Sequence, residues 1–322
     1  MGTEAMQSDI DTERAGRAGL ITLNRPAALN ALTLPMIRAI QVALDAHLAD
    51  PAVQVIVIRS SSPKAFCAGG DMRRIRELSL AGAFDEIANF FREEYALNLA
   101  INRCAKPFVA LLDGIAMGGG LGLSIHGRHR VVTEHASLAM PETAIGFIPD
   151  VGASHFLSRL EPAIGMWLAL TGARISANEA LAVGLATQST RREQLAPLLA
   201  ALGDNAAGTI EEVLQRFSET VDTHAALNGL RQRASGFDAP TLPAVLAAWR
   251  AASGPQATAA FSPAALAQTF DLLHAAQGKS LADCLALEFE ESMHAARHPD
   301  FIEGARAVLV DKDRQPRWQA TQ

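Results

Sequence analysis

Two segments in the first half of the chain share one order: an apolar strand pattern, a glycine loop and the start of a helix. Residues 53–59 (VQVIVIR) precede the loop Ala68-Gly69-Gly70-Asp71, and residues 108–113 (FVALLD) precede the run MGGGLGLS at 117–124. A continuous β-branched run is typical of a parallel strand covered on both faces. The alternation of strand and helix therefore predicts a layered α/β domain with right-handed crossovers. Ligands bind at the C-terminal ends of strands in such sheets, which is where both loops lie.

This alternation continues to about residue 190, and the later chain is Ala- and Leu-rich with only helix-like windows. A chain of 322 residues can bury one large core and an appended segment. We therefore expect an α/β core over residues 18–190 and a helical region over residues 191–322 that completes the site or packs on the core. Apolar spacing predicts helices at 35–48, 71–78, 85–103, 118–127, 152–160 and 162–170, and a strand at 20–24.

Bulk properties exclude several classes of function. A formal net charge of −6 without a Lys/Arg run argues against a nucleic-acid partner. Three cysteines far apart in sequence form neither a disulfide framework nor a metal motif, and the histidines at 126, 129 and 135 lack ligand spacing. No apolar run reaches the ~20 residues of a membrane span, and the acidic N-terminus lacks the apolar centre of a signal peptide. We therefore expect a cytoplasmic protein without a metal, a membrane or a nucleic-acid partner.

The two glycine loops are candidate donors of backbone hydrogen bonds. Glycine lets a ligand approach the backbone closely, and the first N–H groups of a helix have no partner within that helix. Two such loops that meet would present two donors to one carbonyl oxygen, as in an oxyanion hole. Tight turns and close helix packing would equally explain one such loop, and the repeated context favours a site.

Acidic side chains follow the second loop. Glu142 and Asp150 each come directly after a proline, at the expected start of a helix, where capping alone would also explain an acid. They lie eight positions apart with Gly146 between them, so the chain can fold back and bring both carboxylates to one pocket. Carboxylates in one desolvated pocket tend to separate in pKa, which suits acid–base chemistry. Glu93 and Glu94 lie in mid-helix, where such a pair usually faces solvent.

Four motifs then make the chain resemble a known superfamily. LNRPAALNAL, KAFCAGGDM, KPFVALLDGIAMGGGLGLS and PETAIGFIPDVG occur in the order found in the enoyl-CoA hydratase/isomerase (crotonase) superfamily. FFREEYALN, LALTGARISANEA and the tail FIEGARAVLVDKDRQPRW are similar to the 3-hydroxyisobutyryl-CoA hydrolases within it. The resemblance implies a crotonase fold, a spiral of ββα turns with a helical C-terminal region. It also implies an acyl-CoA thioester substrate, of which coenzyme A is a part, no separate cofactor, and a homo-oligomer as one possible assembly.

The resemblance also implies a role for individual residues. The N–H groups of Gly70 and Gly119 would form the oxyanion hole, and Glu142 would be the principal catalytic carboxylate. Asp150 would bind the 3-hydroxyacyl group or position water, and Glu94 would contact the substrate. The loop residues Ala68, Gly69 and Asp71 would lie along the adenine and pantetheine end of the ligand.

The choice of reaction rests on Gly122. Hydratases of this superfamily carry a second catalytic glutamate at the matching position, so its absence favours hydrolysis of a short 3-hydroxyacyl-CoA, such as 3-hydroxyisobutyryl-CoA in valine breakdown. Gln188 and Glu290 depart from the pattern of the hydrolases, which often have histidine and arginine there. Hydration or isomerisation of an enoyl-CoA is the alternative reaction, and a non-catalytic acyl-CoA-binding scaffold is the alternative of another class. The sequence leaves open whether Glu142 activates water or attacks the thioester itself.

Overall fold

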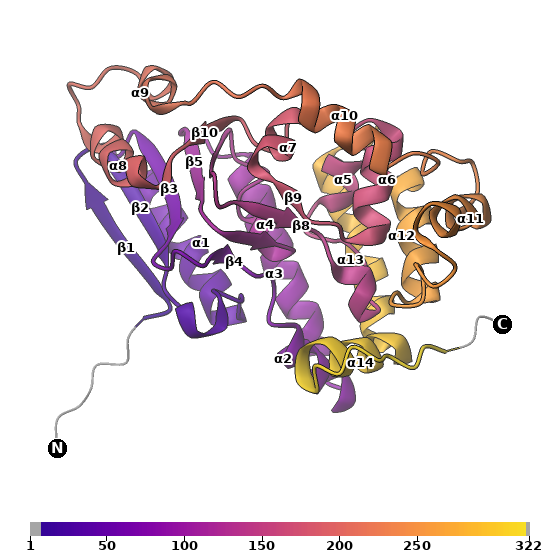
Figure 1. The fold of residues 1–322 in the computed structure, drawn as a ribbon. Coiled ribbons are helices and arrows are strands. Elements are labelled where there is room, and N and C mark those ends of the chain that lie inside the picture. The colour runs from indigo at the N-terminus through magenta and orange to yellow at the C-terminus, as the bar shows by residue number, and fades with distance from the viewer. Residues whose placement is uncertain (1–7, 320–322) are drawn as a thin grey trace.

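The computed structural model describes residues 8–319, in which a mixed sheet of six strands is the larger of two sheets. The first strand is an antiparallel edge, and the other neighbouring strands pair in parallel. Figure 1 shows these strands together in the N-terminal half of the molecule. In sheet order the strands are β1 (Ile10–Ala15), β2 (Ala18–Leu23), β3 (Val55–Ser60), β5 (Phe108–Leu112), β7 (His129–Thr133) and β10 (Gln188–Thr190).

A second, smaller sheet of four strands is formed by strands that alternate along the chain with those of the larger sheet. Its order is β4 (Ala65–Cys67), β6 (Ile115–Met117), β8 (Ser137–Ala139) and β9 (Ile175–Ser176), with β9 antiparallel. Each turn of the chain thus gives one strand to each sheet and then a helix or helical turn: β3-β4-α2, β5-β6-α4 and β7-β8-η2. This repeat is the expected spiral of ββα turns, and it stacks successive loops on one another.

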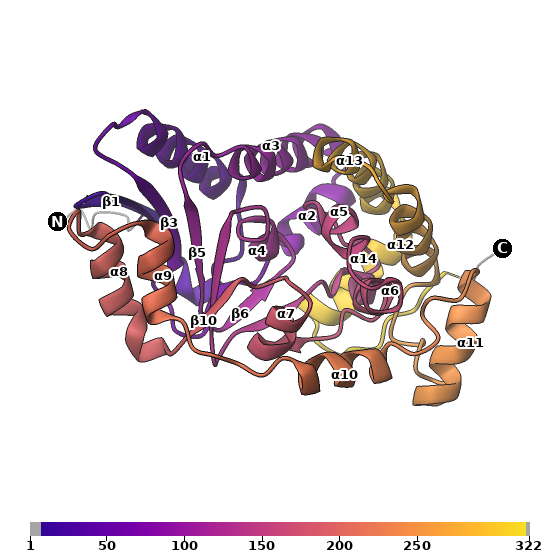
Figure 2. The ribbon, with the colours of Figure 1, turned by 90° about the horizontal axis from the view of Figure 1, so that it is seen from above.

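Helices cover both faces of the larger sheet. On one face lie α1 (Leu34–Ala49) and α3 (Phe84–Asn102), which pack on Ile21, Ile56 and Ile58. On the other face α8 (Leu195–Gly203) and α9 (Ile210–Phe217) pack on the alternating residues of the same strands, such as Leu20 and Val57. Viewed from above, the sheet therefore lies between these two pairs of helices (Figure 2). Burial on both faces explains the continuous apolar runs of its strands.

The remaining helical elements are distributed along the chain, and those from α10 onward form its C-terminal region. They are α2 (Met72–Leu80), α4 (Gly119–Gly122), α5 (Ala153–Leu157), α6 (Pro162–Thr171), α7 (Ala177–Ala182), α10 (His224–Arg233), α11 (Leu242–Ser253), α12 (Pro263–Ala275), α13 (Leu281–Arg297) and α14 (Pro299–Ala305), with short helical turns η1 (Pro26–Ala28), η2 (Glu142–Ile145), η3 (Arg192–Gln194) and η4 (Arg306–Val310). Helix α13 packs along α3, and α14 packs against α2 and η2. Far-separated parts of the chain thus meet around η2.

Most predicted elements are present, with informative differences. The helix expected over 118–127 ends at Gly122, because the following residues continue as turns before β7. The helix expected over 152–160 is limited to α5. Strand β1 escaped prediction because it is an edge strand of which only Ile10 is buried, so its sequence lacks an apolar pattern.

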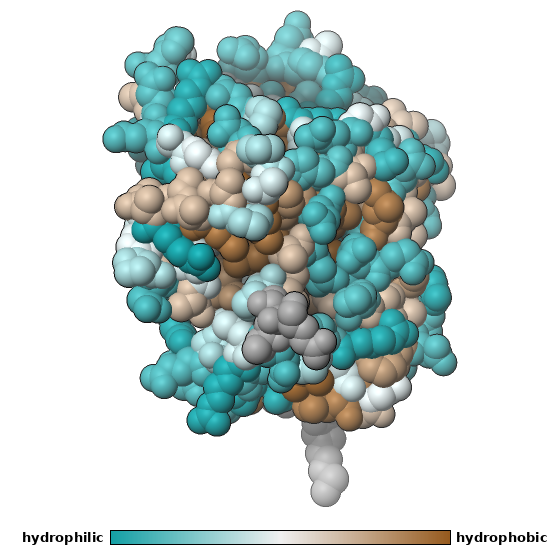
Figure 3. All heavy atoms as spheres, turned by 90° about the vertical axis from the view of Figure 1, so that its right-hand side faces the viewer, coloured by the Kyte–Doolittle hydropathy of each residue, from teal (hydrophilic) through white to brown (hydrophobic). Residues whose placement is uncertain are grey.

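Hydrophobicity is unevenly distributed over the surface. Within residues 8–319, no helix combines the length and the apolar character needed to cross a bilayer. On the face that looks to the right in Figure 1, apolar atoms gather in a central area bordered by hydrophilic side chains (Figure 3).

Candidate active site

The two glycine loops lie against each other at the ends of β4 and β6. The amide nitrogen of Gly70 is 3.3 Å from the point that a Cβ atom on Gly119 would occupy. In the described chain neither of these two amides donates to a backbone acceptor. Backbone hydrogen bonds to the 29–32 segment hold the first loop in place. The N–H of Leu32 donates to the carbonyl of Gly69 (2.8 Å), and the N–H of Asp71 donates to the carbonyl of Leu32 (2.8 Å). Two adjacent, free and fixed N–H donors result.

Glycine is required in these loops because carboxylates lie directly beside them. A Cβ atom on Gly118, whose φ is +48°, would lie 2.6 Å from Oε1 of Glu142. A Cβ atom on Gly119 would lie 2.5 Å from Oε1 of Glu94. Both distances are shorter than van der Waals contact allows, so a side chain at either position would displace an acid. The glycines therefore serve the approach of the carboxylates as well as the turn.

Three buried carboxylates converge on this point from three elements. Glu94 comes from α3, Glu142 from the first turn of η2, and Asp150 from the segment between η2 and α5. Their exposed fractions are 2%, 8% and 7%. In the described chain, Oε1 of Glu94 and Oε2 of Glu142 have no hydrogen-bond partner. Buried acceptors without donors are costly unless a ligand supplies the donor, so these two atoms, which lie close together, mark a candidate binding site.

Burial and mutual repulsion raise the pKa of each acid. The pKa of Glu142 lies well above its usual value, first because burial penalises the charge and then because Asp150 repels it. The pKa of Glu94 is raised well above its usual value by the same two causes. Burial raises the pKa of Asp150 to about 7, against the hydrogen bond from Tyr95 that favours its ionised form. The three acids therefore share fewer than three negative charges near neutral pH.

Asp150 is the most firmly held of the three. The hydroxyl of Tyr95, the one tyrosine of the chain, donates to Oδ2 of Asp150 (2.7 Å) and also contacts Oγ of Ser292 on α13 (2.8 Å). The next two residues, Val151 and Gly152, have φ values of +53° and +85°. Such a left-handed conformation is unfavourable for a β-branched residue and persists only where surrounding contacts enforce it.

The carboxylates and the free amides face one cavity of about 170 Å³. Its other walls are largely apolar, so a small ligand that enters displaces water from it. The C-terminal region closes one side, since Val308 and Leu309 of η4 line the cavity. Its remaining lining is formed by Ala68, Gly69, Gly70, Met72, Phe90, Phe91, Glu94, Gly119, Pro141, Glu142, Ala144, Ile145, Phe147 and Asp150.

Close packing leaves no room for a side chain at position 122. A Cβ atom on Gly122 would lie 2.7 Å from Cβ of Val151 and 2.9 Å from Nδ2 of Asn98. Asn98 is fully buried, and in the described chain neither atom of its amide has a hydrogen-bond partner. A glutamate at position 122 therefore does not fit without movement of the segment that carries Asp150.

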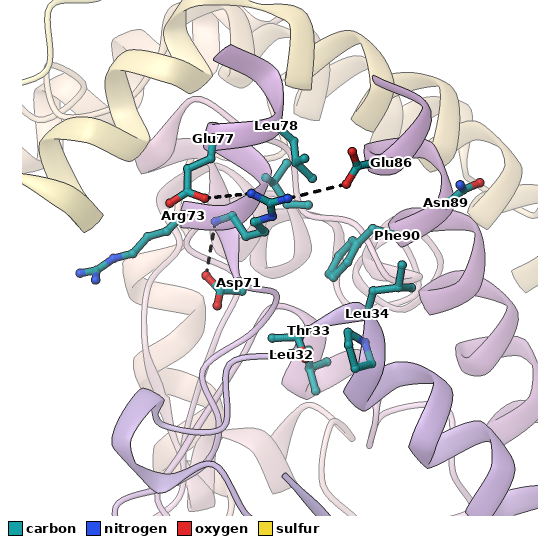
Figure 4. Close-up of a pocket in the computed structure, with 13 residues that line it drawn as sticks. Leu32, Thr33, Leu34, Asp71, Arg73, Glu77, Leu78, Glu86, Asn89 and Phe90 are labelled. Carbon is teal, nitrogen blue, oxygen red and sulfur yellow. Dashed lines mark hydrogen bonds and ion pairs between the residues drawn. The ribbon is translucent and has the colours of Figure 1, made fainter. Parts of the chain in front are cut away.

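A larger cavity of about 560 Å³ opens beside the first, between α2, α3 and the start of α1. In Figure 4, Phe90 lies between α2 and the Leu32–Leu34 segment, and it lines both cavities. Arg74 is neutralised by Glu77 and Glu86 at 3.2 and 3.7 Å. The guanidinium of Arg73 instead donates to the carbonyl of Leu309, and it forms no ion pair with a carboxylate of residues 8–319.

The structure brings the residues predicted from sequence together, with two refinements. Ala68, Gly69, Gly70, Glu94, Gly119, Glu142 and Asp150 line the smaller cavity, whereas Asp71 lines the larger one, caps α2 and pairs with Arg25 at 3.1 Å. The expectation that Glu93 and Glu94 both face solvent is wrong for Glu94, because its side chain is buried and lines the cavity, whereas Glu93 pairs with Arg38 at the surface. Within residues 8–319 no group of three or more His, Cys, Asp or Glu side chains has the geometry of a metal site.

Sequence reasoning missed Tyr95, Glu288 and Ser292. Tyr95 carried a signal, since it is the only tyrosine and follows Glu94 directly. Glu288 and Ser292 carried none, because a polar residue on an amphipathic helix usually faces solvent and α13 lies about 140 residues beyond Asp150 in sequence.

Comparisons with known proteins agree with this arrangement. A model of the enoyl-CoA hydratase/isomerase family matches residues 18–322. The mitochondrial 3-hydroxyisobutyryl-CoA hydrolase of Homo sapiens is 42% identical, over 95% of this chain and 83% of that protein. The same enzyme of Xenopus laevis is 40% identical with the same shares covered.

Solved structures are similar over nearly the whole chain. A carnitinyl-CoA dehydratase from Mycobacterium thermoresistibile is 34% identical with a TM-score of 0.87, covering 97% of this chain and 92% of that one. An enoyl-CoA hydratase from Rhodobacter sphaeroides 2.4.1 is 38% identical with a TM-score of 0.79, covering 97% and 93%. The predicted crotonase fold is confirmed by these similarities.

The expected cellular location is contradicted. The relatives from Xenopus laevis, Gallus gallus and Homo sapiens are named as mitochondrial proteins, so the prediction of a cytoplasmic protein is wrong by this comparison. Composition and cysteine count fail here because an address signal decides the compartment, whereas the physics of the folded domain does not.

Proposed function

We propose that 3-hydroxyisobutyryl-CoA is the substrate of this chain, which belongs to the enoyl-CoA hydratase/isomerase family and is an acyl-CoA thioester hydrolase. The observation that carries the proposal is the meeting of two free backbone donors with three buried carboxylates in a cavity of about 170 Å³. Relatives with this substrate in their name match 95% of the chain. The products would be 3-hydroxyisobutyrate and coenzyme A.

In this proposal the thioester carbonyl lies in the oxyanion hole of Gly70 and Gly119. As a nucleophile attacks, negative charge grows on the carbonyl oxygen, and two fixed N–H donors in a dry cavity stabilise that charge without reorganising. Loss of one such donor typically costs ~10²–10³ in rate. The free amides and the close approach of the two loops support this role.

Glu142 is the proposed catalytic carboxylate. It lies beside Gly118, next to the amide of Gly119, and one of its oxygens has no partner in the described chain. It would either remove a proton from an attacking water molecule or attack the carbonyl itself and form an anhydride that water opens. Coenzyme A leaves as a thiolate in either case. In a single turnover in ¹⁸O-water, label in Glu142 would identify the anhydride route, since only that route lets water add to the carboxyl carbon of Glu142.

Asp150 and Glu94 would bind the 3-hydroxyacyl group. With three acids sharing fewer than three charges, one of them can accept a hydrogen bond from the substrate hydroxyl while another remains protonated. Tyr95 holds Asp150 at 2.7 Å and keeps it aimed into the cavity. A substrate hydroxyl would thus satisfy an acceptor that lacks a protein donor, namely Oε1 of Glu94.

The larger cavity would receive part of the coenzyme A moiety. It adjoins the Gly70 loop through Asp71 and Phe90, and Arg73 places a cation at its edge that a phosphate can pair with. Ala68 to Asp71 would then follow the ligand between the two cavities.

One experiment tests the reaction and its alternatives. The pure protein is incubated with 3-hydroxyisobutyryl-CoA and with crotonyl-CoA, and free thiol and enoyl absorbance are followed together. Thiol release from the first substrate, lost in Glu142→Ala, supports the hydrolase. A change in enoyl absorbance without thiol release would instead identify a hydratase, and tight binding without turnover would identify a scaffold. The crowded contact at Gly122 argues against the hydratase.

A further inference from the structure

A buried carboxylate outside the cavity, that of Glu288, holds the segment that carries Asp150. Glu288 on α13 is fully buried. Its Oε2 accepts a hydrogen bond from the N–H of Gly152 (2.6 Å), and its Oε1 accepts from the N–H (2.8 Å) and the hydroxyl (2.5 Å) of Ser154. These three hydrogen bonds to one carboxylate hold residues 152–154 against α13.

This contact compensates for two features of the segment itself. Val151 and Gly152 have a left-handed backbone conformation, which is energetically unfavourable for valine. Helix α5 begins after Gly152, which has no side chain to cap the first N–H groups. Glu288 supplies that cap from another helix, so the strained conformation next to Asp150 depends on α13.

The same face of α13 reaches Asp150 by a second route. Ser292 lies four residues after Glu288, and residues at this spacing share one face of a helix. Its hydroxyl contacts the Tyr95 hydroxyl (2.8 Å), which donates to Asp150 (2.7 Å). One helix face thus fixes both the backbone after Asp150 and the donor to its carboxylate.

We infer that Glu288 is a positioning residue of the active site, acting together with Ser292 to orient Asp150 toward the substrate. The inference rests on the proposed function only in that Asp150 serves the reaction. Glu288 does not line the cavity, since the lining includes Asp150 and excludes residues 152–154 and 288. The three donors favour the ionised form of Glu288 and so act against the effect of burial. Burial, opposed by these hydrogen bonds, raises the pKa of Glu288 to about 8.

The test substitutes Glu288→Gln, which keeps the volume but turns an NH₂ group toward backbone N–H donors. The matched control is Glu290→Gln, an exposed glutamate on the same helix. We expect kcat for 3-hydroxyisobutyryl-CoA to fall by about 10- to 100-fold, as for other residues that orient a catalytic group, with KM changed less than about threefold. The control should retain wild-type values.

Coupling to Asp150 separates positioning from a general structural effect. If Glu288 acts through Asp150, Glu288→Gln should cost less than about twofold in kcat when added to Asp150→Asn. An equal fold-loss in both backgrounds, or an unchanged kcat in the folded single variant, would refute the inference.

Hydrogen exchange gives a reading that does not depend on activity. Amides of residues 152–154 should exchange faster in Glu288→Gln and not in Glu290→Gln; unchanged exchange contradicts the contact. Should Glu288→Gln fail to fold, Ser154→Ala and Ser292→Ala each remove one hydroxyl of the network and should each lower kcat with KM nearly unchanged. A wild-type protein that does not hydrolyse the substrate would refute the proposed function, while the exchange result would still decide whether Glu288 holds the segment.

Discussion

The cluster of buried acids should make the folded protein less stable as pH rises, and Asp150→Asn should relieve this. Burial raises the pKa of Asp150 from 3.8 to about 7, so the folded state binds a proton over a pH range in which the unfolded state has released it. The associated stability is fully present below pH 3.8 and is lost as pH rises through 7. Asparagine keeps the shape and an acceptor for the Tyr95 hydroxyl and never carries the charge.

The magnitude follows from the size of the shift. One pKa unit corresponds to about 1.4 kcal/mol, so ionising Asp150 in the folded state costs up to about 4 kcal/mol above pH 7. Part of that cost is already present at pH 5. The advantage of Asp150→Asn over wild type in free energy of unfolding should therefore grow by about 2–3 kcal/mol between pH 5 and pH 8. Relief of the repulsion that raises the pKa of Glu94 acts in the same direction.

Urea denaturation at pH 5, 6, 7 and 8 measures this difference directly. Asp271→Asn, an exposed aspartate on α12, is the control and should show no such growth. The variant should lose activity while it gains stability, as expected where a site is strained for function. A stability difference between Asp150→Asn and wild type that stays constant from pH 5 to 8 would refute the assigned pKa and the reasoning about shared charge.

Three further predictions concern single positions. Glu142→Gln should lower kcat for thioester hydrolysis by about 10²–10⁴-fold with the fold intact by circular dichroism, and near-normal turnover would remove Glu142 from the mechanism. Gly122→Ala should destabilise the protein by about 1–3 kcal/mol in urea denaturation, because its Cβ would lie 2.7 Å from Val151 and 2.9 Å from Asn98; an unchanged midpoint would contradict that crowding. Arg73→Ala should raise KM for the CoA thioester several-fold with kcat nearly unchanged in steady-state kinetics, since it removes a contact made equally before and during reaction, and a loss confined to kcat would place this residue elsewhere.

Much of the fold was predictable because its strands and long helices have strong local patterns. Residues 55–58 and 108–112 are continuous apolar runs, and they lie in β3 and β5 with both faces covered. The polar edge strand β1 and the strands of two or three residues in the smaller sheet were not predictable, because such segments gain their stability from neighbours rather than from their own sequence.

The site divides in the same way. Glycine loops and prolines adjacent to acids are local features, so the two loops, Glu142 and Asp150 could be named from the chain alone, whereas the resemblance singled out Gly70 and Gly119 within the loops. The burial of Glu94 could not be predicted from its place in a helix, because it depends on which face of α3 meets the second glycine loop.

By itself the sequence indicated the candidate backbone donors, two of the candidate acids and the family of the chain, because these depend on residue types at short spacings. Tertiary structure alone decided how the acids share charge and what holds Asp150 in place. Those properties arise from segments as distant as β4, α3 and α13 meeting at one point, where low solvent access makes each charge and each hydrogen bond depend on its neighbours.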